Sequence, residues 1–161
     1  MSVERPSTPF DSAFRAPGGL RIAMVAARFN ADIVEGLVAG TLGRLQELGV
    51  KDPTCLLRVP GAWELPEACQ RIIRRERPHA VIAIGAVVRG DTPHFEFVAG
   101  ECGRGLMRVA LDSQTPVIFG VLTTDTLEQA LERSDPERLN KGRDFAEAAV
   151  EMGLLALDDA G

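Results

Sequence analysis

A β-strand that runs directly into a helix is predicted by Ala80-Val81-Ile82-Ala83-Ile84-Gly85-Ala86-Val87-Val88-Arg89-Gly90-Asp91-Thr92-Pro93-His94. The apolar run at its start is typical of a buried strand, and a helical pattern begins near Pro93. Because the first N–H groups of a helix lack intrahelical partners, a strand that breaks at glycines into a helix start forms a natural anion site. A threonine hydroxyl and a titratable histidine lie in the same turn. This combination predicts phosphate binding beside acid–base chemistry.

Short β-rich segments alternate with amphipathic helical patterns along the rest of the chain. Strands are expected at 20–26, 54–59, 80–88 and 116–122, and 123–125 are expected to form a turn and helix cap. Helices are expected from 30 or 32 to 48, from 60 to 78, after 94, at 127–133 and at 141–157. Strands that alternate with helices form βαβ units with right-handed crossovers. The pattern therefore predicts an α/β fold, a flavodoxin-like three-layer α/β/α sandwich around a four-stranded parallel sheet.

Residues with useful chemistry follow the predicted strands. They are Arg28-Phe29-Asn30, Pro60-Gly61-Ala62-Trp63-Glu64, the 89–94 turn and Thr123-Thr124. The carboxyl ends of parallel strands meet at one edge of a sheet, where α/β proteins bind their ligands. We therefore expect one site at this edge.

The bulk properties predict a single cytoplasmic domain. The 161 residues are divided into an N-terminal arm at 1–19 and one domain at 20–161. The net charge of −5 argues against nucleic-acid binding, and the apolar runs are too short to span a membrane. In the arm, Val3, Phe10 and Phe14 are candidates to add to a neighbouring subunit. The three cysteines, Cys55, Cys69 and Cys102, form no CxxC pair and are expected to be free thiols in a reducing compartment.

Three familiar nucleotide or phosphate folds do not fit. The 85–92 segment has the glycine spacing of a Walker A loop, but Asp91 stands where the lysine is required. No GxGxxG follows the first strand, which disfavours a dinucleotide fold. Ala26-Ala27-Arg28 also lacks the acidic residues of a phospho-receiver domain.

Two histidines differ in their expected roles. Histidine titrates near neutral pH, so His94 at a helix start suits proton transfer in both directions. A solvated or structural role remains the alternative. His79 follows Pro78 in a linker and is expected to be structural.

Four further residues have both a functional and an ordinary interpretation. Phe29, in a strand-to-helix turn, either stacks on a planar heterocycle or plugs the sheet edge. Glu64 either interacts with a helix dipole or accepts hydrogen bonds from a polyol. Arg133 and Lys141 are either solvated charges or a phosphate clamp.

Five segments together resemble the 6,7-dimethyl-8-ribityllumazine synthase family. They are Arg28-Phe29-Asn30, Pro60-Gly61-Ala62-Trp63-Glu64-Leu65-Pro66, the 85–95 stretch, the 116–124 stretch and Asn140-Lys141-Gly142. The resemblance runs over about 20–155, and five motifs in order are far more specific than any one of them. It implies condensation of 5-amino-6-ribitylaminopyrimidinedione with 3,4-dihydroxy-2-butanone 4-phosphate, with loss of phosphate and water and without a metal or organic cofactor.

The resemblance also implies a role for each site residue. Phe29, Val87, Val88 and Phe119 would hold the pyrimidinedione ring, Ala62, Trp63 and Glu64 the ribityl chain, and Asp91, Thr92, Arg133 and Lys141 the phosphate. His94 would move protons. Trp63 stands where phenylalanine is common, and Asp91 stands where small residues are frequent. An Asp91 carboxylate that pointed inward would weaken phosphate binding.

The resemblance implies a homo-oligomer as well. The family forms pentamers, some of which assemble into decamers or sixty-subunit shells, and Phe119 and Arg133 would reach the site from the adjacent subunit. Riboflavin synthase is a further implied partner. Two other functions stay open, a flavin or lumazine storage protein without turnover and a structural shell.

Overall fold

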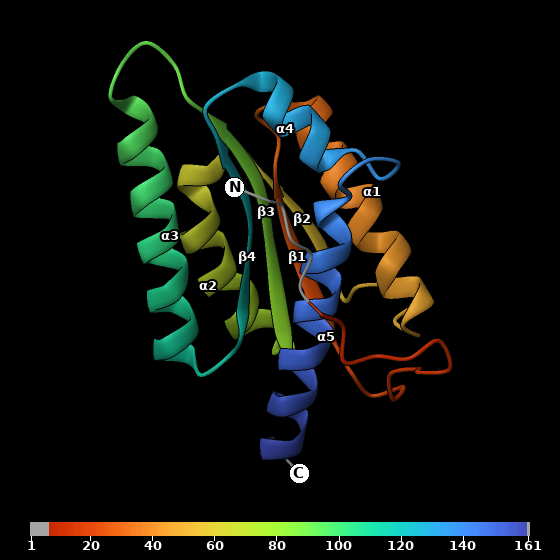
Figure 1. Ribbon diagram of the computed structural model, residues 1–161. Helices are drawn as coiled ribbons and strands as arrows, with labels where there is room; N and C mark the ends of the chain where they lie inside the picture. The colour runs from red at the N-terminus through yellow and green to blue at the C-terminus, as the bar shows by residue number, and fades with distance from the viewer. Residues whose placement is uncertain (1–6, 161) are drawn as a thin grey trace.

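Four parallel strands form one sheet in the order β2-β1-β3-β4. The computed structural model describes residues 7–160, and the strands are β1 (Ile22–Ala27), β2 (Leu56–Val59), β3 (Ala80–Val88) and β4 (Val117–Thr124) (Figure 1). β3 has the predicted bounds, and it pairs with β1 on one side and β4 on the other. This central position explains why its sequence is an uninterrupted apolar run.

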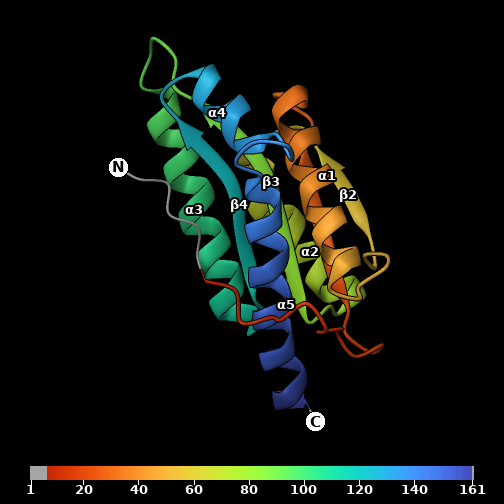
Figure 2. The ribbon, with the colours of Figure 1, turned by 45° about the vertical axis from the view of Figure 1, so that its right-hand side comes forward.

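Helices cover both faces of the sheet and confirm the predicted three-layer α/β/α sandwich. They are α1 (Ala31–Glu47), the short 3₁₀ helix η1 (Ala62–Glu64), α2 (Leu65–Glu76), α3 (His94–Ser113), α4 (Leu127–Ser134) and α5 (Lys141–Ala160). α2 and α3 lie on one face, whereas α1, α4 and α5 lie on the other (Figures 1 and 2). Within residues 7–160, none of the helices has both the length and the apolar composition that a membrane span requires.

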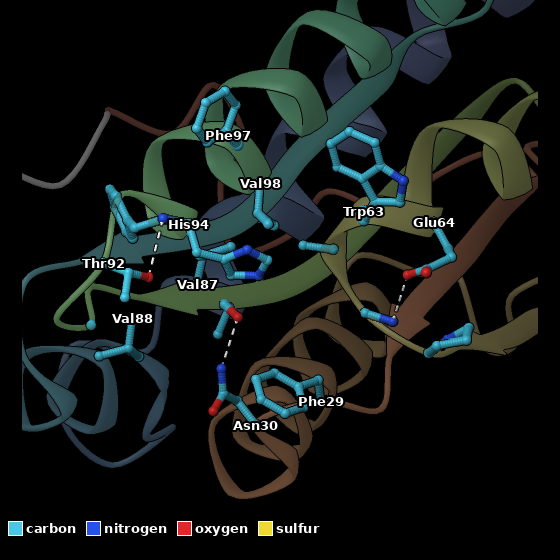
Figure 3. Close-up of a pocket in the computed structure, with 16 residues that line it drawn as sticks. Phe29, Asn30, Trp63, Glu64, Val87, Val88, Thr92, His94, Phe97 and Val98 are labelled. Carbon is cyan, nitrogen blue, oxygen red and sulfur yellow. Dashed lines mark hydrogen bonds between the residues drawn. The ribbon is translucent and has the colours of Figure 1, made fainter.

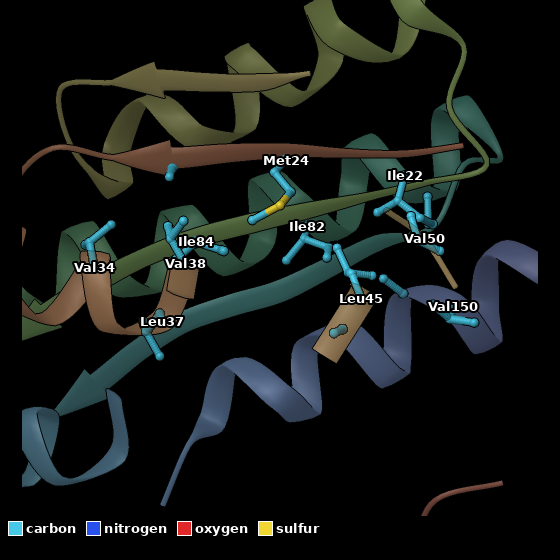
Figure 4. Packing of buried hydrophobic residues seen from close by; sticks show 14 of the residues in the cluster. Ile22, Met24, Val34, Leu37, Val38, Leu45, Val50, Ile82, Ile84 and Val150 are labelled. Atoms are coloured by element: carbon cyan, nitrogen blue, oxygen red, sulfur yellow. The ribbon is translucent and has the colours of Figure 1, made fainter. Parts of the chain in front are cut away.

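Alternate residues of the central strands fill two hydrophobic cores. Met24, Ile82 and Ile84 point toward α1 and α5 and contact Val34 and Leu37 in one apolar cluster (Figure 4). The residues between them along β1 and β3 point the other way, into the cluster beneath α2 and α3. The strands are therefore held from both sides, and their carboxyl ends form a rigid edge.

Part of the N-terminal arm packs on its own chain. The rings of Phe10 and Phe14 lie 4.4 Å apart between centroids, and both pack against the cluster shared by β1, α1 and α5. The Ala16 N–H donates to the Leu48 carbonyl at 2.7 Å. Contact of the arm with a neighbouring subunit stays a prediction, and Val3 lies outside the described residues.

The turn after β4 lies later than predicted. Thr123 and Thr124 belong to the strand, because they continue the parallel pairing with Val87 and Val88 of β3. The cap of α4 is Thr126, whose hydroxyl accepts from the Gln129 N–H at 3.2 Å. The prediction of a turn at Thr123 and Thr124 was therefore wrong, because strand pairing extends beyond the apolar run, whereas Asp125 does lie in the turn.

Candidate active site

A pocket of about 810 Å³ opens at the carboxyl edge of the sheet, as the sequence predicts. Its walls come from the segments that follow β1, β2 and β3 (Figure 3). The lining residues are Phe29, Asn30, Pro60, Gly61, Ala62, Trp63, Glu64, Ala86, Val87, Val88, Gly90, Thr92, His94, Phe95, Phe97 and Val98. Segments separated by more than sixty positions in the sequence thus meet in one cavity.

The β1–α1 turn presents an aromatic ring to this cavity. Asn30 adopts a left-handed conformation with φ of 60°, and its Nδ2 donates to the Ala86 carbonyl at 2.9 Å. The Phe29 N–H donates to the Pro60 carbonyl at 3.0 Å, which ties the turn to the next strand end. The Phe29 side chain remains 71% exposed. A ring this open is not a plug over the sheet edge, and one of its faces is available for stacking.

The β2–α2 turn places Trp63 and Glu64 on the opposite wall (Figure 3). The Gly61 N–H donates to Glu64 Oε2 at 3.0 Å, and the Glu64 N–H donates back to the Gly61 carbonyl at 3.2 Å. This reciprocal pair fixes the carboxylate at the start of α2, where the helix dipole favours a negative charge. A carboxylate accepts more hydrogen bonds than this one, so Glu64 can still receive a hydroxyl from a ligand.

The β3–α3 loop brings a hydroxyl and an imidazole to the third wall. His94 is the first residue of α3, and its N–H donates to Thr92 Oγ1 at 3.4 Å (Figure 3). Both side chains are exposed and line the pocket. Asp91, which directly precedes Thr92, is exposed but does not line the cavity.

Arg89 is a residue of this loop to which sequence reasoning assigned no role. Its guanidinium forms ion pairs with Asp125, at 2.9 Å, and with Glu96, and it lies 4.3 Å from the centroid of the Phe95 ring. The hydrogen bonds that Arg89 donates to Asp125 and Glu96 raise the pKa of Arg89, and the bond to Glu96 lowers the pKa of the Glu96 carboxyl. The sequence shows an arginine before a helix start, but it does not show that its partners are Glu96 in α3 and Asp125 after β4. Its role could therefore not be predicted.

Besides Asp91, three predicted site residues lie outside the pocket of the single chain. Phe119 is on the edge strand β4 and is 45% exposed. Arg133, in the last turn of α4, donates to the Gln129 carbonyl at 3.1 Å. Lys141, the first residue of α5, lies 3.2 Å from an Asp144 carboxylate oxygen. The chain by itself does not bring these side chains to Thr92 and His94.

His79 has the structural position that the sequence predicts. It immediately precedes β3, at the end of the strand opposite the pocket. The Arg21 N–H donates to its Nδ1 at 2.9 Å, so the ring acts as a neutral acceptor. Burial, together with the charge of Arg21, lowers the pKa of His79.

The cysteines are also structural. All three are free, as predicted, and Cys69 of α2 and Cys102 of α3 are buried against the sheet. Burial raises the pKa of Cys69 to about 12 and that of Cys102 to about 11. Thiols in this environment are poor nucleophiles, because the thiolate is the reactive form.

The fold and the pocket define an α/β protein with a cavity at the carboxyl edge of a parallel sheet. A family model described as 6,7-dimethyl-8-ribityllumazine synthase matches residues 19–156. The chain belongs to this family, whose members are transferases of riboflavin biosynthesis.

Proposed function

We propose that this chain condenses 5-amino-6-(D-ribitylamino)pyrimidine-2,4-dione with 3,4-dihydroxy-2-butanone 4-phosphate in the cytoplasm, the penultimate step of riboflavin biosynthesis. The observation that carries the proposal is the pocket itself. It gathers an open aromatic ring, a fixed carboxylate, a hydroxyl and an imidazole from the ends of three strands, in a chain of this family.

The pyrimidinedione and its ribityl chain fit the apolar and acidic walls. The Phe29 ring stacks on the planar heterocycle, and Val87 and Val88 contact its edge. The Ala62–Glu64 turn follows the ribityl chain, and the Glu64 carboxylate accepts hydrogen bonds from its hydroxyls. Each of these residues lines the cavity.

The reaction requires proton transfers that one imidazole can perform. The 5-amino group attacks the ketone of the second substrate, and the carbinolamine loses water to give an imine. Loss of the proton from C3 then expels phosphate with the C4–O electron pair, leaving an enol that becomes a ketone with a new methyl group. The ribitylamino nitrogen attacks that ketone, and a second water leaves. His94, at the loop beside the phosphate, takes and returns the protons.

The phosphate requires a cation that this pocket does not supply. Among residues 7–160, the residues that line the cavity include neither arginine nor lysine. Thr92, the Asp91 main chain and the first N–H groups of α3 donate to the phosphate. Arg133 comes from the adjacent copy in a homopentamer and binds the phosphate, with Lys141 nearby. Phe119 of the same adjacent copy contacts the pyrimidinedione ring. The pentamer is also the unit that builds decamers or sixty-subunit shells and that associates with riboflavin synthase.

The test is an optical assay with both substrates, which follows the lumazine chromophore and released phosphate together. Equal amounts of both products, formed above the spontaneous rate, support the synthase. Trp63 is the only tryptophan in a chain without tyrosine, so its fluorescence reports ligand binding in the same samples. Quenching by riboflavin without turnover would contradict the proposal and indicate a storage protein.

A further inference from the structure

We propose that Arg89 is a positioning residue that fixes the 89–93 loop and thereby sets the orientation of His94. The inference rests on the proposed function, because it assigns to Arg89 a role in the acid–base chemistry of that site. Arg89 itself does not line the pocket.

Arg89 connects three segments at the edge of the sheet. Its main-chain N–H donates to the Thr124 carbonyl at 2.8 Å, which holds the end of β3 against β4. Its Nε donates to Asp125 Oδ1 at 2.9 Å, in the turn after β4. Its Nη1 contacts Glu96 in the first turn of α3, two residues beyond His94. Through its main chain and its side chain, Arg89 therefore fixes both ends of the loop relative to the sheet.

The Phe95 ring extends this contact to the wall of the pocket. The guanidinium lies 4.3 Å from the ring centroid, within the range of a cation–π interaction. Phe95 is partly buried against the core cluster of β3 and α3, and it also lines the cavity. Because Phe95 and Glu96 directly follow His94, Arg89 restrains the helical turn from which the imidazole projects.

The other contacts within the loop are weaker. The bond from the His94 N–H to Thr92 Oγ1 is 3.4 Å long, beyond the usual range for N–H···O hydrogen bonds. A Cβ placed on Gly90 would have no atom within 4 Å, so the loop is open around it. In Figure 1 this loop rises above the sheet edge between β3 and α3. Its geometry thus depends on the ends that Arg89 holds.

Lysine cannot replace this arrangement. The guanidinium is a planar fork that reaches two carboxylates while its face lies on an aromatic ring, whereas an ammonium is a point charge. The carboxylates of Asp125 and Glu96 also neutralise the charge of Arg89. Arg89 is therefore not the cation that binds the phosphate. Exposed ion pairs contribute little to the free energy of unfolding, so we expect loss of Arg89 to change the orientation of His94 rather than the stability of the protein.

The test compares kcat, KM and melting temperature for the wild type, Arg89→Ala, Arg89→Lys, His94→Ala and the double variant Arg89→Ala/His94→Ala. We expect Arg89→Ala to lower kcat roughly tenfold, since a small misplacement of a catalytic group costs one to two orders of magnitude. KM should change little, and Arg89→Lys should recover only part of kcat. In the His94→Ala background, Arg89→Ala should have no further effect, because a residue that acts through His94 has nothing left to position.

A matched control is Arg71→Ala, which removes an exposed ion pair with Glu67 on α2, outside the pocket. It should leave kcat unchanged, and its melting temperature should match that of Arg89→Ala. Independent losses that multiply in the double variant would overturn the proposal, as would an Arg89→Ala enzyme with wild-type kcat. If the wild type itself shows no turnover, the proposed function fails first, and the two failures are thus distinguished.

Discussion

Replacing Gly142 with alanine tests the close crossing of α1 and α5. A Cβ at this position would press on the Leu37 carbonyl oxygen and would lie 2.7 Å from the Thr41 nitrogen. The Thr41 hydroxyl donates to the Leu37 carbonyl of its own helix at 2.7 Å and lies 3.1 Å from the Gly142 carbonyl. These neighbours are backbone atoms, so rotation of a side chain cannot relieve the contact. The two helices must move apart.

The expected cost follows from two opposing effects. Alanine is favoured over glycine in a helix by up to about 1 kcal/mol. Gly142 is the second residue of α5, where this gain is smaller than in a helix interior, and the Thr41 hydroxyl keeps its bond to the Leu37 carbonyl. Overpacking then dominates, and it typically costs about 1–3 kcal/mol. We therefore expect Gly142→Ala to lower the free energy of unfolding by about 1–3 kcal/mol.

The assay is urea denaturation at one fixed protein concentration, with Gly43→Ala as the control. Gly43 lies in α1, is exposed, and a Cβ there would have no atom within 4 Å. This control should be as stable as the wild type or more so by up to about 1 kcal/mol. With a urea dependence of about 1–3 kcal/mol per molar, the Gly142→Ala midpoint should fall by roughly 0.3–3 M. A midpoint at or above that of the wild type would refute the reasoning.

Four further predictions concern the site and the buried groups. His94→Ala should slow turnover by about 10²–10⁴-fold without abolishing it, in steady-state assays. Arg133→Ala should chiefly raise the apparent KM for the phosphorylated substrate; an unchanged KM would argue against its role. Burial lowers the pKa of His79 in the folded chain, so the unfolded chain binds a proton at His79 more readily. The free energy of unfolding therefore falls as pH drops below about 6.5. His79→Ala should reduce the difference between the urea midpoints measured at pH about 7.5 and about 5.5. Because their pKa values are raised to about 12 and about 11, Cys69 and Cys102 should not react with Ellman's reagent at pH about 8 until urea unfolds the protein.

The architecture was predictable because the sequence shows both the continuous apolar runs of buried strands and the helical spacing of amphipathic helices. The apolar run at Ala80–Val88 indicates a strand buried on both faces, and the structure places it at the centre of the sheet. On α2, Leu65, Cys69 and Ile72 recur at helical spacing, and all three are buried. A parallel sheet with helices on both faces follows from such alternation with few alternatives.

The ends of elements were less predictable, since they depend on partners distant in sequence. Thr124 reads as a turn residue by composition, yet it pairs with Val88 and extends β4. At the other end of that turn, the reciprocal bonds between Thr126 and Gln129 decide where α4 begins. Strand pairing overrides local preference wherever a neighbouring strand continues.

The candidate site was predictable to the extent that it consists of strand ends. Phe29, Glu64 and His94 follow three different strands, and the parallel topology alone brings them to one edge. The role of Asn30 was not predictable, because its left-handed backbone and its bond to the Ala86 carbonyl exist only in the folded chain. Asn30 is the N-cap of α1, as the sequence allowed, but its side chain makes no cap bond and its amide donates to β3 instead.

Arg89 and Arg133 show why charge near a predicted phosphate site does not establish phosphate binding. Arg89 is close in sequence to Thr92, yet its guanidinium is occupied by Asp125 and Glu96. Arg133 is distant, and its side chain donates to the Gln129 carbonyl of its own helix and lies 4.0 Å from one carboxylate oxygen, that of Glu132. An arginine that already pairs with two carboxylates holds the surrounding loop in place, whereas an arginine with spare N–H donors can bind a phosphate. The two substitutions should therefore have different kinetic effects. Arg89→Ala should lower kcat, whereas Arg133→Ala should raise the KM for the phosphorylated substrate.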